Sequence, residues 1–126
     1  LHALLGVSDF VTIHQRLSDR THGLIGEAEF KQMKSSAFLI NTSRGPIVDD
    51  VALIEAVNSG EIAGAGIDVY DREPLPTSHP LRRCDGLLLT PHLGYVTRKT
   101  WDVFYGQTVE DVLAWIDGKP IRVIEP

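Results

Sequence analysis

The sequence predicts an α/β fold built on a parallel β-sheet, and three observations support this prediction. Four short segments are apolar almost throughout, as expected of strands buried on both faces. Segments between them have apolar residues at helical spacing. Strands that alternate with helices are typical of crossover connections between parallel strands. With 126 residues, 43% of them hydrophobic, the chain is long enough to form one core.

The first half of the chain contains two predicted strands and one short helix. The first strand covers Asp9 to His14, whose β-branched and aromatic residues suit a pleated surface, so the chain enters its first strand almost at once. A short helix follows over Glu27 to Lys34, where Phe30 and Met33 are spaced for one face. The second strand covers Ala37 to Thr42. This order is that of one crossover unit.

The second half contains a further crossover and a longer helix. Asp49 or Asp50 is able to cap the next helix, and Gly60 supplies a residue that ends it. Strands follow at Ala63 to Val69 and at Gly86 to Thr90, and the prolines between them exclude a regular helix. The last helix is predicted from aromatic and other residues at helical spacing, namely Trp101, Phe104, Tyr105, Thr108, Val112, Trp115 and Ile116.

Composition excludes several classes of partner. The net charge is −5 with acidic and basic residues interspersed, so we expect neither nucleic acid nor an anionic membrane as partner. No apolar stretch approaches the roughly 20 residues that span a bilayer. The single cysteine, Cys84, excludes a disulfide within the chain and suits a reducing, cytoplasmic setting. His2, His22 and His79 have no second ligand at metal spacing, so we expect no metal site.

Arg44, Glu73 and His92 each follow a different predicted strand. Because the carboxyl ends of parallel strands meet at one edge of the sheet, we expect the three side chains to lie together, near Asp68. Arginine binds a carboxylate through two parallel hydrogen bonds, and histidine moves a proton near neutral pH. A carboxylate beside the histidine fixes its tautomer. The set predicts proton transfer on an acid substrate, although each residue alone could serve only a turn, a solvated loop or a backbone hydrogen bond.

Four stretches of the chain resemble the motif regions of the D-isomer-specific 2-hydroxyacid dehydrogenases; they are INTSRGPIVDD, AGAGIDVYDREPLP, SHPL and LLLTPHLGYVT. HQRLSDRTHGLIG resembles the stretch after the fourth nucleotide-domain strand of that family. The resemblance implies the second half of a Rossmann-type doubly wound parallel sheet over residues 1–96, with about four strands and helices on both faces. It also implies that residues 97–126 form a long C-terminal helix and a tail that returns toward a substrate domain.

The resemblance implies a reaction and a role for each site residue. The reaction is hydride transfer between NAD and C2 of a small-molecule D-2-hydroxy or 2-keto acid, in which Arg44 binds the substrate carboxylate, His92 is the acid/base and Glu73 pairs with His92. Glutamate at position 73, where the family's formate dehydrogenases carry glutamine, argues against formate. The residues expected to bind the cofactor are Val11, His14, Thr42, Ser43, Arg44, Asp68, His92 and Gly94.

The G-x-G-x-x-G loop that holds the cofactor pyrophosphate in this family is not found among the 126 residues. Gly64-Ala65-Gly66 has valine where the third glycine should be and enters a strand. We therefore expect a fragment of a longer dehydrogenase that is a homodimer when intact, with NADP not excluded as cofactor. Two other functions stay open: a non-catalytic NAD-sensing interaction protein of the same fold, and an inactive truncated remnant.

Overall fold

The computed structural model describes residues 1–124 and divides into two units. The first unit, Leu1–Leu93, contains the sheet, and the second begins at Gly94 and contains one long helix. All three residues of the expected acid/base site therefore belong to the first unit.

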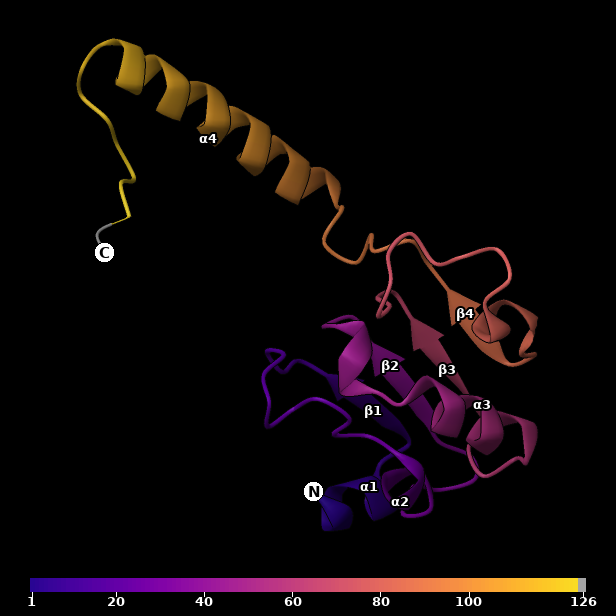
Figure 1. Ribbon diagram of the computed structural model, residues 1–126. Helices are drawn as coiled ribbons and strands as arrows, with labels where there is room; N and C mark the ends of the chain where they lie inside the picture. Colours follow the sequence, from indigo (N-terminus) through magenta and orange to yellow (C-terminus); the bar gives the residue numbers. More distant parts are fainter. Residues whose placement is uncertain (125–126) are drawn as a thin grey trace. The chain divides into compact units, whose positions relative to one another are not determined.

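The sheet has four parallel strands in the order β1 (Phe10–Ile13), β2 (Phe38–Asn41), β3 (Gly64–Ile67) and β4 (Leu87–Leu89), as Figure 1 shows. Chain order and spatial order are the same, so each strand neighbours the next along the chain. This arrangement confirms the predicted α/β class with its parallel sheet. It also brings the carboxyl ends of all four strands to one edge.

Short helices connect the strands. The connections contain α2 (Glu27–Phe30), α3 (Asp50–Asn58) and two 3₁₀ helices, η1 (Gly45–Ile47) and η2 (Pro80–Arg83). Asp49 caps α3, because its carboxylate accepts hydrogen bonds from the backbone N–H groups of the helix's first turn. Helix α2 ends at Phe30, before the predicted Lys34. The backbone N–H of Met33 bonds to the carbonyl of Phe30, three residues back, so the chain continues as a tight turn and not as an α-helix.

Helix α1 (His2–Val7) precedes the first strand, so the expectation that the chain enters a strand almost at once was wrong. The segment contains good helix formers, and Leu5 is fully buried in the core. Only one residue of α1 is buried, so no apolar stripe revealed the helix in the sequence. Ser8 ends α1, and its hydroxyl donates to the carbonyl of Leu4 at 2.8 Å.

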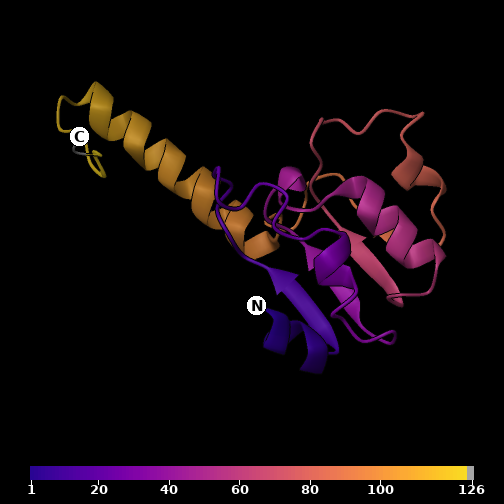
Figure 2. The ribbon, with the colours of Figure 1, turned by 60° about the horizontal axis from the view of Figure 1, so that its bottom comes forward.

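One face of the sheet forms the core of the first unit. Alternate strand residues, among them Val11 and Leu39, pack with Phe30 of α2 and Leu53 of α3 in a single cluster. Figure 2 shows α2 and α3 on the same side of the strands. Each fully buried large side chain contributes about 1.5 to 3 kcal/mol, so this cluster holds the sheet and helices together.

The opposite face of the sheet is exposed within the first unit. The rings of Phe10 and Phe38 stack there with centroids 5.7 Å apart, and Phe10 and Leu88 are both 69% exposed. We expected helices on both faces of the sheet. Within residues 1–93 the helices cover one face only. The apolar residues on the other face have no helix against them in this unit.

The second unit contains helix α4 (Arg98–Ile116), which confirms the predicted long C-terminal helix. Thr97 caps it, since its hydroxyl accepts a hydrogen bond from the N–H of Thr100 at 3.1 Å. The rings of Trp101 and Tyr105 stack with centroids 4.4 Å apart. None of the residues of α4 is buried. Among the described residues, no helix combines the length and the apolar character needed to cross a membrane.

Candidate active site

The turn that carries Arg44 is held by a buried asparagine. Asn41, at the end of β2, is 1% exposed; its side-chain amide donates to the Arg44 carbonyl at 3.0 Å and accepts from the Ser43 N–H at 3.1 Å. The Ser43 hydroxyl donates to the Ile13 carbonyl at 2.7 Å, which ties the turn to β1. Within residues 1–124 the ion pairs do not include Arg44, whose guanidinium donates to the Ser43 carbonyl. Its remaining donors suit an anionic ligand.

Gly45 allows the Arg44 turn to approach the loop after β3. A Cβ atom at residue 45 would lie 2.1 Å from the carbonyl carbon of Tyr70 and 2.4 Å from the N of Asp71. Both are backbone atoms, so no side chain could give way. Only glycine fits here, and this contact sets how near Arg44 lies to the loop of Glu73.

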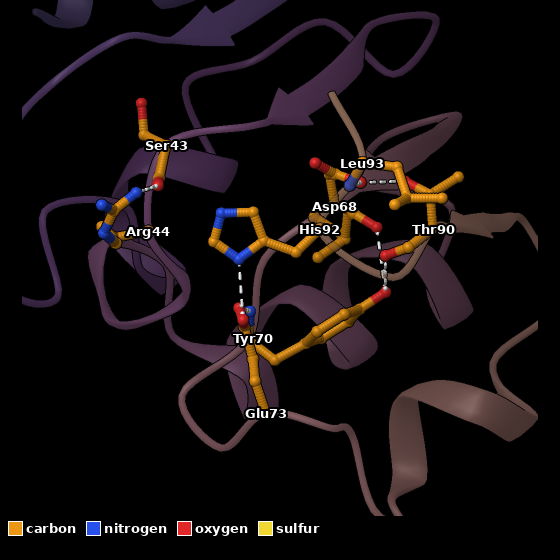
Figure 3. Close-up of polar contacts among 9 residues, drawn as sticks. Ser43, Arg44, Asp68, Tyr70, Glu73, Thr90, His92 and Leu93 are labelled. Atoms are coloured by element: carbon orange, nitrogen blue, oxygen red, sulfur yellow. Dashed lines mark hydrogen bonds and ion pairs between the residues drawn. The ribbon is translucent and has the colours of Figure 1, made fainter. Parts of the chain in front are cut away.

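His92 and Glu73 form a hydrogen-bonded pair. His92 Nδ1 lies 2.7 Å from Glu73 Oε2, and the side chains are 34% and 36% exposed respectively. The backbone N–H of Tyr70 donates to Glu73 Oε1 at 2.9 Å. This N–H, the bond from His92 and the charge of Arg44 lower the pKa of Glu73 below its ordinary value. A carboxylate at Nδ1 fixes the tautomer, and the second ring nitrogen points away from Glu73, toward the side where Ser43 and Arg44 lie (Figure 3).

Asp68 holds the residues on either side of His92. The Asp68 side chain is 4% exposed, and its Oδ1 accepts hydrogen bonds from the Leu93 N–H at 2.8 Å and from the Thr90 hydroxyl (Figure 3). His92 itself has φ 59°, in the left-handed region that non-glycine residues rarely adopt. The buried carboxylate thus fixes a strained turn from which the imidazole projects toward Glu73.

Two hollows adjoin these residues in the first unit. One, of about 510 Å³, is lined by Tyr70, Glu73, Pro74, Leu75, Arg82, Leu89, Thr90, Pro91 and His92. The other, of about 500 Å³, is lined by His14, Gln15, Arg16, Leu17, Thr42, Ser43 and Arg44. The second is open and rich in hydrogen-bond donors at the carboxyl ends of β1 and β2, which fits a polar, anionic ligand such as part of a dinucleotide.

The structure therefore brings Arg44, Glu73 and His92 to one edge of the sheet, as the sequence predicted. Of the expected cofactor residues, His14, Thr42 and Ser43 line the hollow beside Arg44. Val11 lies in the core, 6% exposed, and its part in flanking a nucleotide stays a prediction. Gly94 begins the second unit, and its predicted cofactor contact also stays a prediction.

Sequence reasoning missed three residues of this edge, Asn41, Tyr70 and Thr90. Asn41 is the only amide in the apolar stretch AFLINT, and this polar residue at the end of a buried strand was a usable signal. Nothing in the local pattern marks Tyr70 or Thr90, because their partners lie 3 to 22 residues away in the chain.

The remaining conspicuous residues take no part in this edge. No group of three or more His, Cys, Asp or Glu side chains in the described part of the chain is placed to hold a metal ion. Burial and the neighbouring Asp85 raise the pKa of the Cys84 thiol, which disfavours the reactive thiolate. His79 lies 3.8 Å from Asp50 and accepts a hydrogen bond at the start of η2.

Comparison with known proteins finds a matching family and similar sequences. Residues 1–94 match the family model described as "D-isomer specific 2-hydroxyacid dehydrogenase, NAD binding domain". Glyoxylate/hydroxypyruvate reductase B of Enterobacter sp. (strain 638) is 43% identical over 118 residues, which cover 94% of this chain and 36% of the reductase. The chain thus spans little more than a third of that relative.

Solved structures are also similar to nearly the whole chain, and two of them were solved with a nicotinamide cofactor. The D-isomer specific 2-hydroxyacid dehydrogenase of Lactobacillus delbrueckii ssp. bulgaricus, solved in its NAD complexed form, matches with a TM-score of 0.81 and 33% identity over 98% of this chain and 42% of that one. The D-isomer specific 2-hydroxyacid dehydrogenase of Xanthobacter autotrophicus Py2, solved with NADPH and MES, matches with a TM-score of 0.75 and 36% identity over 97% of this chain and 50% of that one.

Proposed function

The chain belongs to the D-isomer-specific 2-hydroxyacid dehydrogenase family, and on this premise we propose that it supplies the acid/base site for hydride transfer at C2 of a D-2-hydroxy or 2-keto acid. The observation that carries the proposal is the 2.7 Å contact between Glu73 and His92 at the sheet edge that also carries Arg44. The reaction requires a group that binds the substrate carboxylate, which Arg44 supplies in this proposal, and a proton-transfer pair, which His92 and Glu73 supply.

Each side chain has a distinct task in the proposed reaction. Arg44 binds the substrate carboxylate through parallel hydrogen bonds and so orients C2. His92 gives a proton to the carbonyl oxygen in reduction and takes it from the hydroxyl in oxidation. Glu73 holds the ring through Nδ1, so that the other nitrogen faces the substrate, and stabilises the imidazolium. The nicotinamide cofactor, when bound, supplies or accepts the hydride.

The cofactor is NAD, with NADP not excluded. We propose that His14, Thr42, Ser43 and Arg44 contact it from the open hollow beside β1 and β2. We propose that Asp68, His92 and Gly94 contact the nicotinamide end of the cofactor; the hydrogen bond from the Leu93 N–H to the Asp68 carboxylate, which keeps Asp68 close to the His92 turn, supports this for Asp68. Val11 would act through its backbone, since its side chain is in the core.

For the whole protein we propose a homodimer in the cytoplasm that acts on a small 2-keto or 2-hydroxy acid. The free thiol of Cys84 supports a reducing compartment. Light scattering during gel filtration would measure the oligomeric state.

The activity is tested in a chimera in which this chain replaces the matching segment of the Enterobacter reductase named above. We expect the chimera to reduce glyoxylate or hydroxypyruvate. His92→Ala should lower kcat by about 10² to 10⁴-fold, because a proton-transfer group is lost. Arg44→Ala should mainly raise KM.

The matched control is His22→Ala, which removes an exposed histidine outside the edge site. It should leave both constants unchanged. A His92→Ala chimera whose kcat stays within about threefold of the parent would refute the acid/base role. Tight NADH binding without turnover in the folded parent chimera would favour the cofactor-sensing alternative instead.

A further inference from the structure

Tyr70 contacts Glu73, the end of the strand that leads to His92, and the turn that follows Arg44, and it is not one of the proposed acid/base groups. Its side chain is buried, 8% exposed, in the loop directly after β3. Its backbone N–H donates to Glu73 Oε1 at 2.9 Å, so it holds the carboxylate oxygen that does not face His92. Its backbone also contacts Gly45, where a Cβ would lie 2.1 Å away, and so sets the position of the Arg44 turn.

The hydroxyl of Tyr70 reaches the strand that leads to His92. It lies 2.8 Å from the carbonyl oxygen of Thr90 and 3.1 Å from that of Ile67, so its single hydrogen links the ends of β3 and β4 (Figure 3). Burial, together with the charge of Asp68, raises the pKa of Tyr70, and the phenol therefore keeps its proton and remains a donor.

The turn that follows Thr90 needs such support. His92 adopts a backbone conformation that strains a non-glycine residue and persists only where the surroundings over-determine it. Asp68 binds the Thr90 hydroxyl and the Leu93 N–H. The Tyr70 hydroxyl binds the Thr90 carbonyl from the core side. The two contacts fix different atoms of Thr90, so neither replaces the other.

We propose that Tyr70 is the positioning residue that holds His92 against Glu73, through its hydroxyl bond to the Thr90 carbonyl and its N–H bond to Glu73. The inference rests on the proposed function only where it assigns proton transfer to the pair of His92 and Glu73. Loss of the hydroxyl leaves the ring, the N–H and both partner side chains in place. It should loosen the turn and lengthen the contact between Nδ1 and Oε2.

The first test reads the His92 tautomer in this chain by ¹⁵N NMR of the imidazole at a pH where the ring is neutral. In the parent chain the Nδ1–H form should dominate, because Glu73 accepts that hydrogen. Tyr70→Phe should lower the fraction of this form by at least about twofold. Tyr105→Phe is the matched control, since it removes an exposed hydroxyl from α4. The amide spectrum of β1 to β3 reports whether each variant is folded.

The second test measures kinetics in the reductase chimera. Tyr70→Phe should lower kcat by roughly 10-fold and leave KM for the keto acid within about twofold, because Arg44 keeps its place while the proton donor is misaligned. A general loss of structure would change both constants. Tyr105→Phe should change neither.

The outcomes separate this inference from the proposed function. A folded Tyr70→Phe chain with the parent tautomer fraction, or a chimera with the parent kcat, overturns the positioning role and leaves the proposed function intact. A tautomer shift in the chain beside a folded parent chimera that is inactive overturns the proposed function and leaves the positioning role supported.

Discussion

Replacing Gly45 by alanine tests how closely the Arg44 turn must approach the loop after β3. The new Cβ would lie 2.1 Å from the Tyr70 carbonyl carbon and 2.5 Å from its Cα, whereas ordinary van der Waals contact begins at 3.4 Å. The two backbone segments must therefore separate by roughly 1 Å. Both segments belong to the site, so the separation moves Arg44 away from Glu73.

The cost follows from that displacement. Overpacking of this kind destabilises by about 1 to 3 kcal/mol, which lowers Tm by roughly 4 to 15 °C in a chain of this size. A misplacement of about 1 Å can cost around 10²-fold in rate. We therefore expect Gly45→Ala to lower kcat/KM of the chimera by about 10²-fold. Part of this change should be a rise in KM, because Arg44 is the proposed clamp on the substrate carboxylate.

Thermal unfolding of the chain and steady-state kinetics of the chimera measure these effects. Gly106→Ala is the matched control, because Gly106 lies inside α4 and a Cβ there meets nothing within 4 Å. It should raise stability by about 0.5 to 1 kcal/mol through its higher helix propensity. The reasoning fails if Gly45→Ala melts at the parent temperature and keeps the parent KM.

Three further predictions concern the same edge. Glu73 has a lowered pKa in the folded state, so its contribution to stability is present above the unfolded value near 4.5 and is lost as pH falls through the lower folded value. The difference in unfolding free energy between the parent and Glu73→Gln, measured by denaturant at pH 7 and pH 3, should therefore be smaller at pH 3. An equal difference at both pH values would contradict this. Asn41→Ala removes two hydrogen bonds to the Ser43–Arg44 turn and should lower the unfolding free energy, measured with denaturant, by about 1 to 3 kcal/mol. It should also raise KM in the chimera. An unchanged unfolding midpoint would show that these two hydrogen bonds do not stabilise the turn. The 126-residue chain, which has no G-x-G-x-x-G loop, should bind NADH no tighter than about millimolar in a calorimetric titration, and micromolar binding would refute this.

The strands, and the sheet edge at which Arg44, Glu73 and His92 lie, could be predicted from the sequence because their signals are local. Each strand is a short apolar run, and parallel order follows from the helices between the runs. That order is enough to place Arg44, Glu73 and His92 at one edge without knowledge of any side-chain contact. The pairing of Glu73 with His92 then follows from their chemistry.

The supports of the site could not be predicted in the same way. The Tyr70 hydroxyl acts on a carbonyl 20 residues later, and Asp68 acts on a backbone N–H 25 residues later. Neither spacing has a local pattern, since both depend on the register of β3 against β4. Helix α1 was missed for a related reason: Leu5 is its one buried residue, so tertiary contact rather than periodicity defines it.

Under the proposed function, the left-handed backbone of His92 makes the stability of the fold and the activity favour different residues at one position. Glycine would adopt this conformation without strain, and relief of a left-handed non-glycine residue is worth on the order of 1 to 3 kcal/mol. The same change would delete the imidazole and its bond to Glu73. A screen of the chimera for heat resistance alone should therefore accept glycine at this position, whereas the proposed acid/base role of His92 requires that a screen for turnover reject it.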